Sequence, residues 1–224
     1  MEKVIEARKI YLSYDKKNNI IRNASFSIKA REVVIITGVS GSGKSTLLKS
    51  FYGDIAISNG SLRVKNHELF KVSKQDLRDM RKNIGIVFQD YKLINNYTAE
   101  ENVALPLEIQ GYKNDFCKKQ ARKLLAHVSL SLKAKKYPYE LSGGEQQRIG
   151  VARAIAHNPK LILADEPTGN LDEYSSNLIW DLFQKASKEI GATVVVVTHT
   201  LPKELDDFHY RRLHLEDGVL NEIY

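Results

Sequence analysis

The sequence predicts an α/β fold with a parallel sheet at its centre, an antiparallel β layer and a helical insertion. Three apolar, β-branched runs indicate the parallel strands, at residues 32–37, 160–164 and 192–198. Because these runs are continuously apolar rather than alternating, each strand is expected to be covered on both faces. Each run ends at a glycine loop or a polar residue, and ligands of open α/β sheets lie beyond the carboxyl ends of such strands. The sequence therefore predicts a binding site at that edge of the sheet.

The antiparallel layer and the helices follow from shorter signals. Short strands are expected at 4–14, 24–28 and 61–64, with turn signals at Asn18-Asn19 and Asn59-Gly60 between them. The stretch from about 99 to 156 is richer in helix formers, and helices are expected at 118–127 and 145–156.

Composition excludes several classes of protein. The chain has 224 residues, of which 42% are hydrophobic and 27% charged, so it is neither disordered, collagen-like nor a disulfide scaffold. Its single cysteine, Cys117, excludes an internal disulfide and a multi-cysteine metal site. No run approaches the roughly 20 apolar residues of a membrane span, and the first residues lack an apolar run of signal-peptide type, so we expect a cytosolic chain.

The charge balance leaves the partner open. Lys and Arg number 34 against 27 Asp and Glu, a net charge of +7. Such a balance is compatible with nucleic acid, with an anionic membrane face or with a phosphate ligand.

Residues 38–45, GVSGSGKS, fit the phosphate-loop pattern G-x-x-x-x-G-K-[ST]. The glycines let successive backbone N–H groups point at a phosphate where a helix begins. Lys44 is expected to reach the β- and γ-phosphates, and the Ser45 hydroxyl to ligate Mg²⁺. The residues expected to bind the nucleotide here are Gly38, Ser40, Gly41, Ser42, Gly43, Lys44, Ser45 and Thr46.

A second acidic site follows another apolar run. Residues 161–164 lead directly into Asp165 and Glu166. Alone, this pattern is typical of a strand that meets a solvated turn. Beside a phosphate loop, Asp165 is suited to the waters around Mg²⁺, and Glu166 is suited to orient the attacking water.

Residues 141–148, LSGGEQQR, lie between these two sites. In isolation, Ser142 followed by Glu145 indicates a helix capping box. In this order, the motifs resemble those of the ATP-binding cassette (ABC) ATPases over nearly the whole chain. The resemblance implies one ATP-binding domain over 1–224: a P-loop NTPase (RecA-like) core, an antiparallel β subdomain and an α-helical subdomain at about 92–155.

The resemblance also implies roles for further residues. Gln89 is similar to the glutamine that contacts the metal and the attacking water, so Ser45, Gln89 and Asp165 form the expected metal set. His199 resembles the switch histidine near the γ-phosphate. The remaining matches are Asp172 in the loop after the acidic pair, Tyr11 as the aromatic that stacks on adenine, with Tyr14 close by, and Ser142, Gly143, Gly144 and Glu145 in the signature sequence.

Members of this family bind ATP and Mg²⁺ between two copies arranged head to tail. The resemblance therefore implies that the signature loop of one copy contacts the γ-phosphate held by the other. Residues 163–172 resemble a group that contains the cell-division protein FtsE, the lipoprotein-release ATPase LolD and the macrolide exporter MacB. Residues 87–93 are most similar to FtsE.

An FtsE-like chain implies three further expectations. These are an integral membrane partner of the FtsX type, a peripheral location on the cytoplasmic face of the inner membrane, and control of cell-wall hydrolysis in bacterial division. A LolD- or MacB-like role in lipoprotein release or efflux is the alternative. A cassette that acts on DNA or ribosomes is disfavoured, because such chains usually carry two cassettes or a long coiled coil, so no nucleic-acid partner is expected.

Three features depart from the family pattern or stay open. Ala30-Arg31-Glu32 replaces the common Pro-Gly-Glu turn and is expected to need an unusual backbone angle. Thr200 stands where aspartate is common. A cluster of basic residues has three interpretations: a solvated helical face, a contact with anionic lipid or a nucleic-acid surface. The last is disfavoured because no stacking aromatics accompany the cluster. Its members are Lys118, Lys119, Arg122, Lys123, Lys133, Lys135 and Lys136.

Overall fold

The computed structural model describes residues 2–14, 18–199, 201 and 208–223. Their core is a six-stranded sheet in the order β10-β9-β3-β8-β7-β6, in which β10 is antiparallel to β9 and the others are parallel. Its strands are β3 (Val33–Thr37), β6 (Ile84–Val87), β7 (Leu161–Asp165), β8 (Thr193–Val197), β9 (Arg211–Glu216) and β10 (Val219–Ile223). The three expected parallel strands are confirmed as β3, β7 and β8.

The antiparallel layer is a second sheet, in the order β2-β1-β4-β5. It consists of β1 (Lys3–Leu12), β2 (Ile21–Lys29), β4 (Ile57–Val64) and β5 (His67–Glu68). The antiparallel layer is confirmed, but the prediction of a turn at Asn59-Gly60 is wrong. Strand β4 runs through both residues beside a register shift between Arg8 and Tyr11 of β1. Gly60 has φ +90°, and a Cβ there would lie 2.3 Å from the Lys9 carbonyl oxygen, so the pair belongs to a β-bulge.

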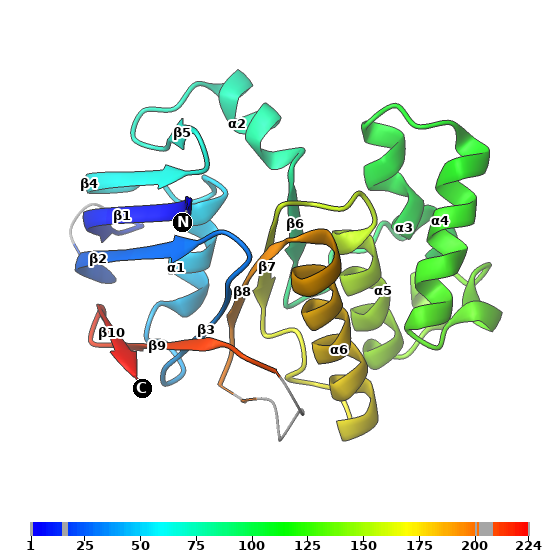
Figure 1. Ribbon diagram of the computed structural model, residues 1–224. Coiled ribbons are helices and arrows are strands. Elements are labelled where there is room, and N and C mark those ends of the chain that lie inside the picture. The colour runs from blue at the N-terminus through cyan, green and yellow to red at the C-terminus, as the bar shows by residue number, and fades with distance from the viewer. Residues whose placement is uncertain (1, 15–17, 200, 202–207, 224) are drawn as a thin grey trace.

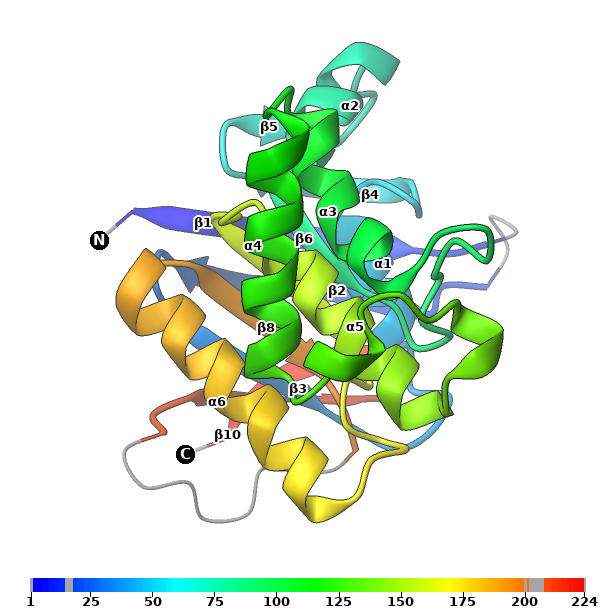
Figure 2. The same ribbon diagram turned by 90° about the vertical axis from the view of Figure 1, so that its right-hand side faces the viewer.

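Helices cover the core sheet and extend beyond it. They are α1 (Lys44–Phe51), α2 (Lys74–Arg81), α3 (Ala99–Ile109), α4 (Asn114–His127), α5 (Gly143–Ile155) and α6 (Glu173–Ile190), with short 3₁₀ turns at Ser131–Lys133 and Pro138–Glu140. The expected helices are confirmed as α4 and α5. Helices α3 and α4 lie at the opposite end of the molecule from the antiparallel sheet (Figure 1), and the turned view shows them in front of α5 (Figure 2). Among the described residues, no helix combines the length and apolar content that crossing a bilayer requires.

Two apolar clusters lie on opposite faces of the core sheet. On β3, Val34 and Ile36 pack with α1 and the antiparallel sheet, whereas Val33 and Ile35 pack with residues of α3 to α6. All four side chains are buried. Coverage of both faces is therefore the physical reason for the continuously apolar strands.

The turn before β3 has the unusual geometry that its sequence predicts. Arg31 has φ 65°, the left-handed region that glycine adopts most easily. Its backbone N–H donates to the Thr193 hydroxyl over 3.0 Å, which holds the turn against β8. The expectation about Thr200 lies outside the described residues.

Candidate nucleotide site

A pocket of about 760 Å³ lies beyond the carboxyl ends of the parallel strands. Segments that follow β3, β6, β7 and β8 meet here, because parallel strands bring their ends to one edge of the sheet. The segment that follows β1 of the antiparallel sheet adds Tyr14 and Ile20. The lining residues are Tyr14, Ile20, Ser40, Gly41, Gly43, Lys44, Ser45, Thr46, Gln89, Glu166, Gly169, Asn170 and His199.

The loop between β3 and α1 forms one wall of this pocket. The Lys44 ammonium donates hydrogen bonds to the carbonyl oxygens of Gly38 (2.9 Å) and Val39 (3.0 Å). Ser42 Oγ is buried and has no hydrogen-bond partner among the described residues. Gly38 and Ser42, which were also expected to bind the nucleotide, belong to this loop but do not line the pocket. Lys44 can exchange loop carbonyls for phosphate oxygens without leaving the loop.

Ser45, which lines the nucleotide pocket, meets Asp165, which lines an adjoining pocket. Ser45 Oγ donates to Asp165 Oδ1 over 2.9 Å. Burial raises the pKa of Asp165, although the Ser45 hydrogen bond opposes this shift. A cation at this point would stabilise the ionised carboxylate.

The donor set at this point fits Mg²⁺. Gln89 lines the nucleotide pocket and also an adjoining pocket that contains Ser45 and Asp165. A hydroxyl, a carboxylate and an amide oxygen are oxygen ligands, which Mg²⁺ prefers alongside substrate phosphates. The described residues contain no cluster of three His, Cys, Asp or Glu side chains. Mg²⁺ commonly takes one or two protein ligands together with substrate phosphates.

Glu166 is held in a strained backbone conformation. It lies directly after β7 with φ 46°, and its N–H donates to the Val197 carbonyl over 2.9 Å. Its Oε2 accepts from the Thr198 hydroxyl (3.0 Å) and lies 2.9 Å from His199 Nδ1. Strain of this kind concentrates at functional sites. The structure therefore brings Glu166 and His199 together on the pocket wall.

The aromatic side chain at the pocket is Tyr14, not the expected Tyr11. Tyr11 lies within β1, where it pairs with Asn59 of β4, and is absent from the pocket lining. Tyr14 follows the end of β1, and its hydroxyl lies 3.3 Å from Thr46 Oγ1. A side chain inside the strand packs within the sheet, whereas one beyond the strand end reaches the nucleotide loop. Ile20, which the sequence reasoning missed, also lines the pocket.

Asp172 also has a different position from the expected one. It caps α6, where its Oδ1 accepts from the Ser175 N–H over 2.8 Å. An Asp at a helix N-cap satisfies an otherwise unpaired backbone donor. The pocket is instead lined by Gly169 and Asn170 of the same loop. Asn170 lies two residues before Asp172 in the sequence, and no spacing rule indicates which of the two reaches the pocket.

The signature residues lie away from this pocket, at the start of α5. Ser142 N–H donates to Glu145 Oε2 (2.8 Å), and Glu145 N–H donates to Ser142 Oγ (3.3 Å), which completes a capping box. Glu145 also pairs with Lys133 at 3.3 Å. Its carboxylate is therefore committed to the helix cap rather than to a nucleotide. Ser142 and Gly143 are exposed, so this helix N-terminus is accessible to a second molecule.

Part of the basic cluster has partners within the chain. Arg122 and Lys135 both contact Glu100, which is buried, and Lys136 pairs with Glu140 at 2.7 Å. These residues stabilise the packing of α3, α4 and the following turn. Lys118, Lys119 and Lys123 are exposed on α4, as either a solvated face or a lipid contact would require.

The model of the ABC transporter family matches residues 21–169. The chain belongs to this family. It is 40% identical to the cell division ATP-binding protein FtsE of Streptococcus pneumoniae serotype 2 over 215 residues, which cover 96% of this chain and 93% of that protein. It is 39% identical to the methionine import ATP-binding protein MetN of Carboxydothermus hydrogenoformans over 200 residues, 88% of this chain but 59% of that protein.

Solved structures agree with the assignment of the fold. The ATP-binding cassette MJ0796, described as a dimer in a post-hydrolysis state bound to ADP and Pi, superposes with a TM-score of 0.89 and 34% identity. The match covers 98% of this chain and 97% of that one. The fold is thus that of an ABC cassette, and the chain is an ABC-type ATPase that binds ATP.

Proposed function

We propose that this cassette is the ATPase subunit of an FtsEX-like complex, which signals through a membrane partner to regulate cell-wall hydrolysis in cell division. The observation that carries the proposal is the match to FtsE from end to end, 96% of this chain against 93% of its relative. The match to MetN, by contrast, leaves much of that longer protein uncovered. An FtsX-like subunit would hold the cassette at the cytoplasmic face of the inner membrane.

The site residues support direct hydrolysis of ATP. Lys44 and the loop amides bind the β- and γ-phosphates, and Tyr14 stacks on adenine. Glu166 accepts a proton from the attacking water as the new bond to the γ-phosphorus forms and the bond to the bridging oxygen breaks, which releases ADP and phosphate. His199, 2.9 Å from Glu166, orients that carboxylate.

Ser45, Gln89 and Asp165 would hold Mg²⁺. When bound, the ion supplies charge neutralisation for the phosphates. The contact between Ser45 Oγ and Asp165 Oδ1 already brings a hydroxyl and a carboxylate oxygen within 2.9 Å of each other.

ATP would also assemble two cassettes. The exposed N-terminus of α5, with Ser142, Gly143 and Gly144, is suited to the γ-phosphate held by a second copy. The dimeric MJ0796 cassette supports this arrangement. Only the closed dimer makes both sets of contacts, so ATP favours it and hydrolysis releases it. The segment at about 92–155 would transmit the change to the membrane partner.

The membrane partner provides the test. The tagged chain, purified in detergent from its own cells, is expected to retain an FtsX-like protein with four spans and one large outer loop. Cells that carry only the Glu166→Gln form are expected to retain the complex but fail to divide. Recovery of a lipoprotein-release permease, with normal division in the Glu166→Gln strain, would instead support the LolD-like alternative.

A further inference from the structure

The turn after Gln89 has two consecutive strained residues. Tyr91 has φ 61° and Lys92 has φ 45°, both in the left-handed region. Neither is glycine, asparagine or aspartate, so both conformations are strained and persist only where the surrounding structure enforces them. Something outside the turn must therefore hold this conformation.

Arg153 of α5 supplies that restraint. Its guanidinium donates to the Lys92 carbonyl (2.6 Å) and to the Tyr91 carbonyl (2.7 Å), so one planar fork holds both strained residues. Burial lowers the pKa of Arg153 to about 10, which leaves it charged at neutral pH. The Asp90–Lys92 ion pair, by contrast, is exposed and contributes little.

The Tyr91 ring connects the same turn to the other end of α5. A Cβ on Gly150 would lie 3.8 Å from the Tyr91 carbonyl oxygen, and a Cβ on Gly143 would lie 3.0 Å from its hydroxyl. Gly143 and Gly150 are two helical turns apart and share one face of α5. Only the contact at Gly143 is tighter than an ordinary van der Waals contact, so it is the missing side chain of Gly143 that leaves room for the Tyr91 hydroxyl against the first residue of the helix.

We propose that Arg153 and Tyr91 are positioning residues that fix Gln89 in the nucleotide pocket and connect it to the signature end of α5. Gln89 stands two residues before Tyr91 and lines the pocket. A turn released from Arg153 would move Gln89 relative to Ser45 and Asp165 without removing any group that binds ATP. The inference rests on the proposed role of Gln89 in hydrolysis.

Steady-state turnover and binding of a fluorescent ATP analogue test the guanidinium clamp. Arg153→Lys keeps the charge but replaces the rigid planar fork with a single ammonium nitrogen on a flexible chain. The turn is then held less firmly, so kcat is expected to fall between about tenfold and 100-fold while the analogue's Kd stays within about twofold. Adding Lys92→Gly should restore part of the lost kcat, because glycine adopts the left-handed φ without strain. A purely structural role of Arg153 would not predict that recovery.

A matched control separates this clamp from arginine clamps in general. Arg81 also donates to two successive carbonyls, those of Tyr52 (2.8 Å) and Gly53 (3.1 Å). Arg81→Lys is expected to keep wild-type kcat. Equal losses in Arg81→Lys and Arg153→Lys, or wild-type kcat in Arg153→Lys, would overturn the proposal.

A separate comparison of single and double variants tests the Tyr91 contact, and it remains informative even if Arg153→Lys does not fold. Gly144→Ala controls for the role of this loop in binding phosphate, because a Cβ on Gly144 would meet Leu171 and not Tyr91, so adding Tyr91→Phe to it should restore nothing. A Cβ on Gly143 would crowd the Tyr91 hydroxyl, so Gly143→Ala with Tyr91→Phe should turn over ATP faster than Gly143→Ala alone. No difference between the two would contradict the proposed packing. Gln89→Ala separately tests the role of Gln89 on which the inference rests. Full activity of Gln89→Ala would contradict both that role and the positioning role of Arg153 and Tyr91. Failure to find an FtsX-like partner would contradict neither of these two roles.

Discussion

Glu166 is the residue whose geometry bears most directly on the chemistry. Its carboxylate is largely buried, accepts from Thr198 and lies 2.9 Å from His199, yet it lines the nucleotide pocket. A carboxylate fixed in this way can orient a water without rearranging.

Glu166→Gln is expected to lower ATP turnover by about 10²–10⁴-fold, because the amide cannot accept the proton of the attacking water. ATP affinity should change little, so ATP-bound dimers should accumulate on size-exclusion chromatography. Substantial turnover by this variant would exclude Glu166 as the base.

Substitution of Tyr14 and of Tyr11 by alanine tests which of the two tyrosines stacks on adenine. Tyr14→Ala is expected to weaken ATP binding by about 1–3 kcal/mol, the range for stacking of one base on an aromatic ring. Tyr11→Ala should leave the Kd of ATP nearly unchanged, since Tyr11 lies outside the pocket lining. Titration calorimetry with both variants distinguishes them, and the reverse order of effects would restore Tyr11 as the stacking residue.

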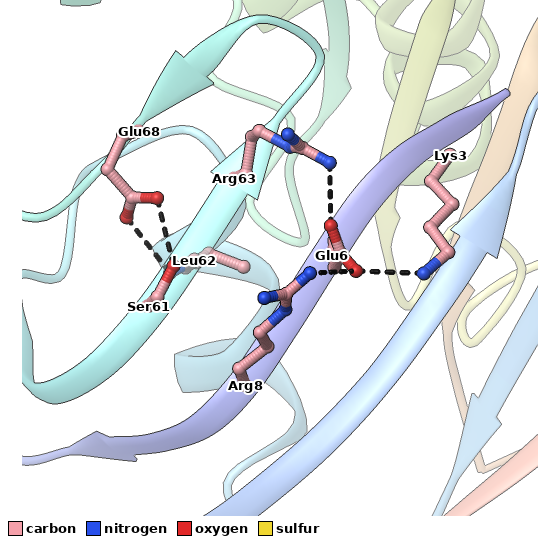
Figure 3. A network of polar contacts seen from close by, with 7 residues as sticks. All are labelled: Lys3, Glu6, Arg8, Ser61, Leu62, Arg63 and Glu68. Carbon is pink, nitrogen blue, oxygen red and sulfur yellow. Dashed lines mark hydrogen bonds and ion pairs between the residues drawn. The ribbon is translucent and has the colours of Figure 1, made fainter.

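At the scale of elements, strands β1 and β4 are joined by a charged cluster on the antiparallel sheet. Glu6 of β1 faces Arg63 of β4 in the register and contacts it at 2.6 Å, while Lys3 and Arg8 approach its other oxygen at 2.8 and 3.0 Å (Figure 3). The hydrogen bonds from Lys3 and Arg8 lower the pKa of Glu6 to about 2. The ionised form of Glu6 is therefore favoured in the folded state.

This shift predicts a pH dependence of stability. The contribution of Glu6 is present in full above its ordinary pKa of 4.5 and is lost as the pH falls towards 2. Urea midpoints of wild type and Glu6→Gln should differ most above pH 4.5 and converge below it. The exposed Glu108→Gln is the control and should follow the wild-type profile. A difference that grows on acidification would contradict the assignment.

The sequence predicts elements well where burial alone decides them. Strands β3, β7 and β8 are apolar on both faces, so their pattern is visible without the structure. Strand β9, RRLHLE, alternates, and β6 has only four residues, so neither was predicted. Helix α6 was also missed.

Sequence reasoning selects residues that line the pocket where a motif fixes the backbone, as in the phosphate loop and at Glu166. They were not predicted where two nearby side chains compete for one role. Asp172 was assigned to the nucleotide, but it serves the first turn of α6, and Asn170 lies at the pocket. Tyr11 lies within β1 and Tyr14 beyond its end, and the local sequence does not indicate where that strand ends.

At the scale of the whole molecule, the two halves of the proposed reaction site lie apart. Lys44 and Glu166 line the pocket, whereas Ser142 lies at the exposed start of α5 and does not. One copy of the chain therefore presents Lys44 and Glu166 to its own pocket, but not its own Ser142. The central claim is that a second copy completes each site.

Mixing two inactive variants tests this claim most directly. Lys44→Ala removes the phosphate ligand, and Ser142→Asp keeps the helix cap while placing a negative charge against the γ-phosphate. Each variant alone is expected to be inactive. In an equal mixture, half of the dimers contain one intact site, so turnover should recover to about one quarter of wild type if the sites act independently. A mixture as inactive as its components would contradict the shared site.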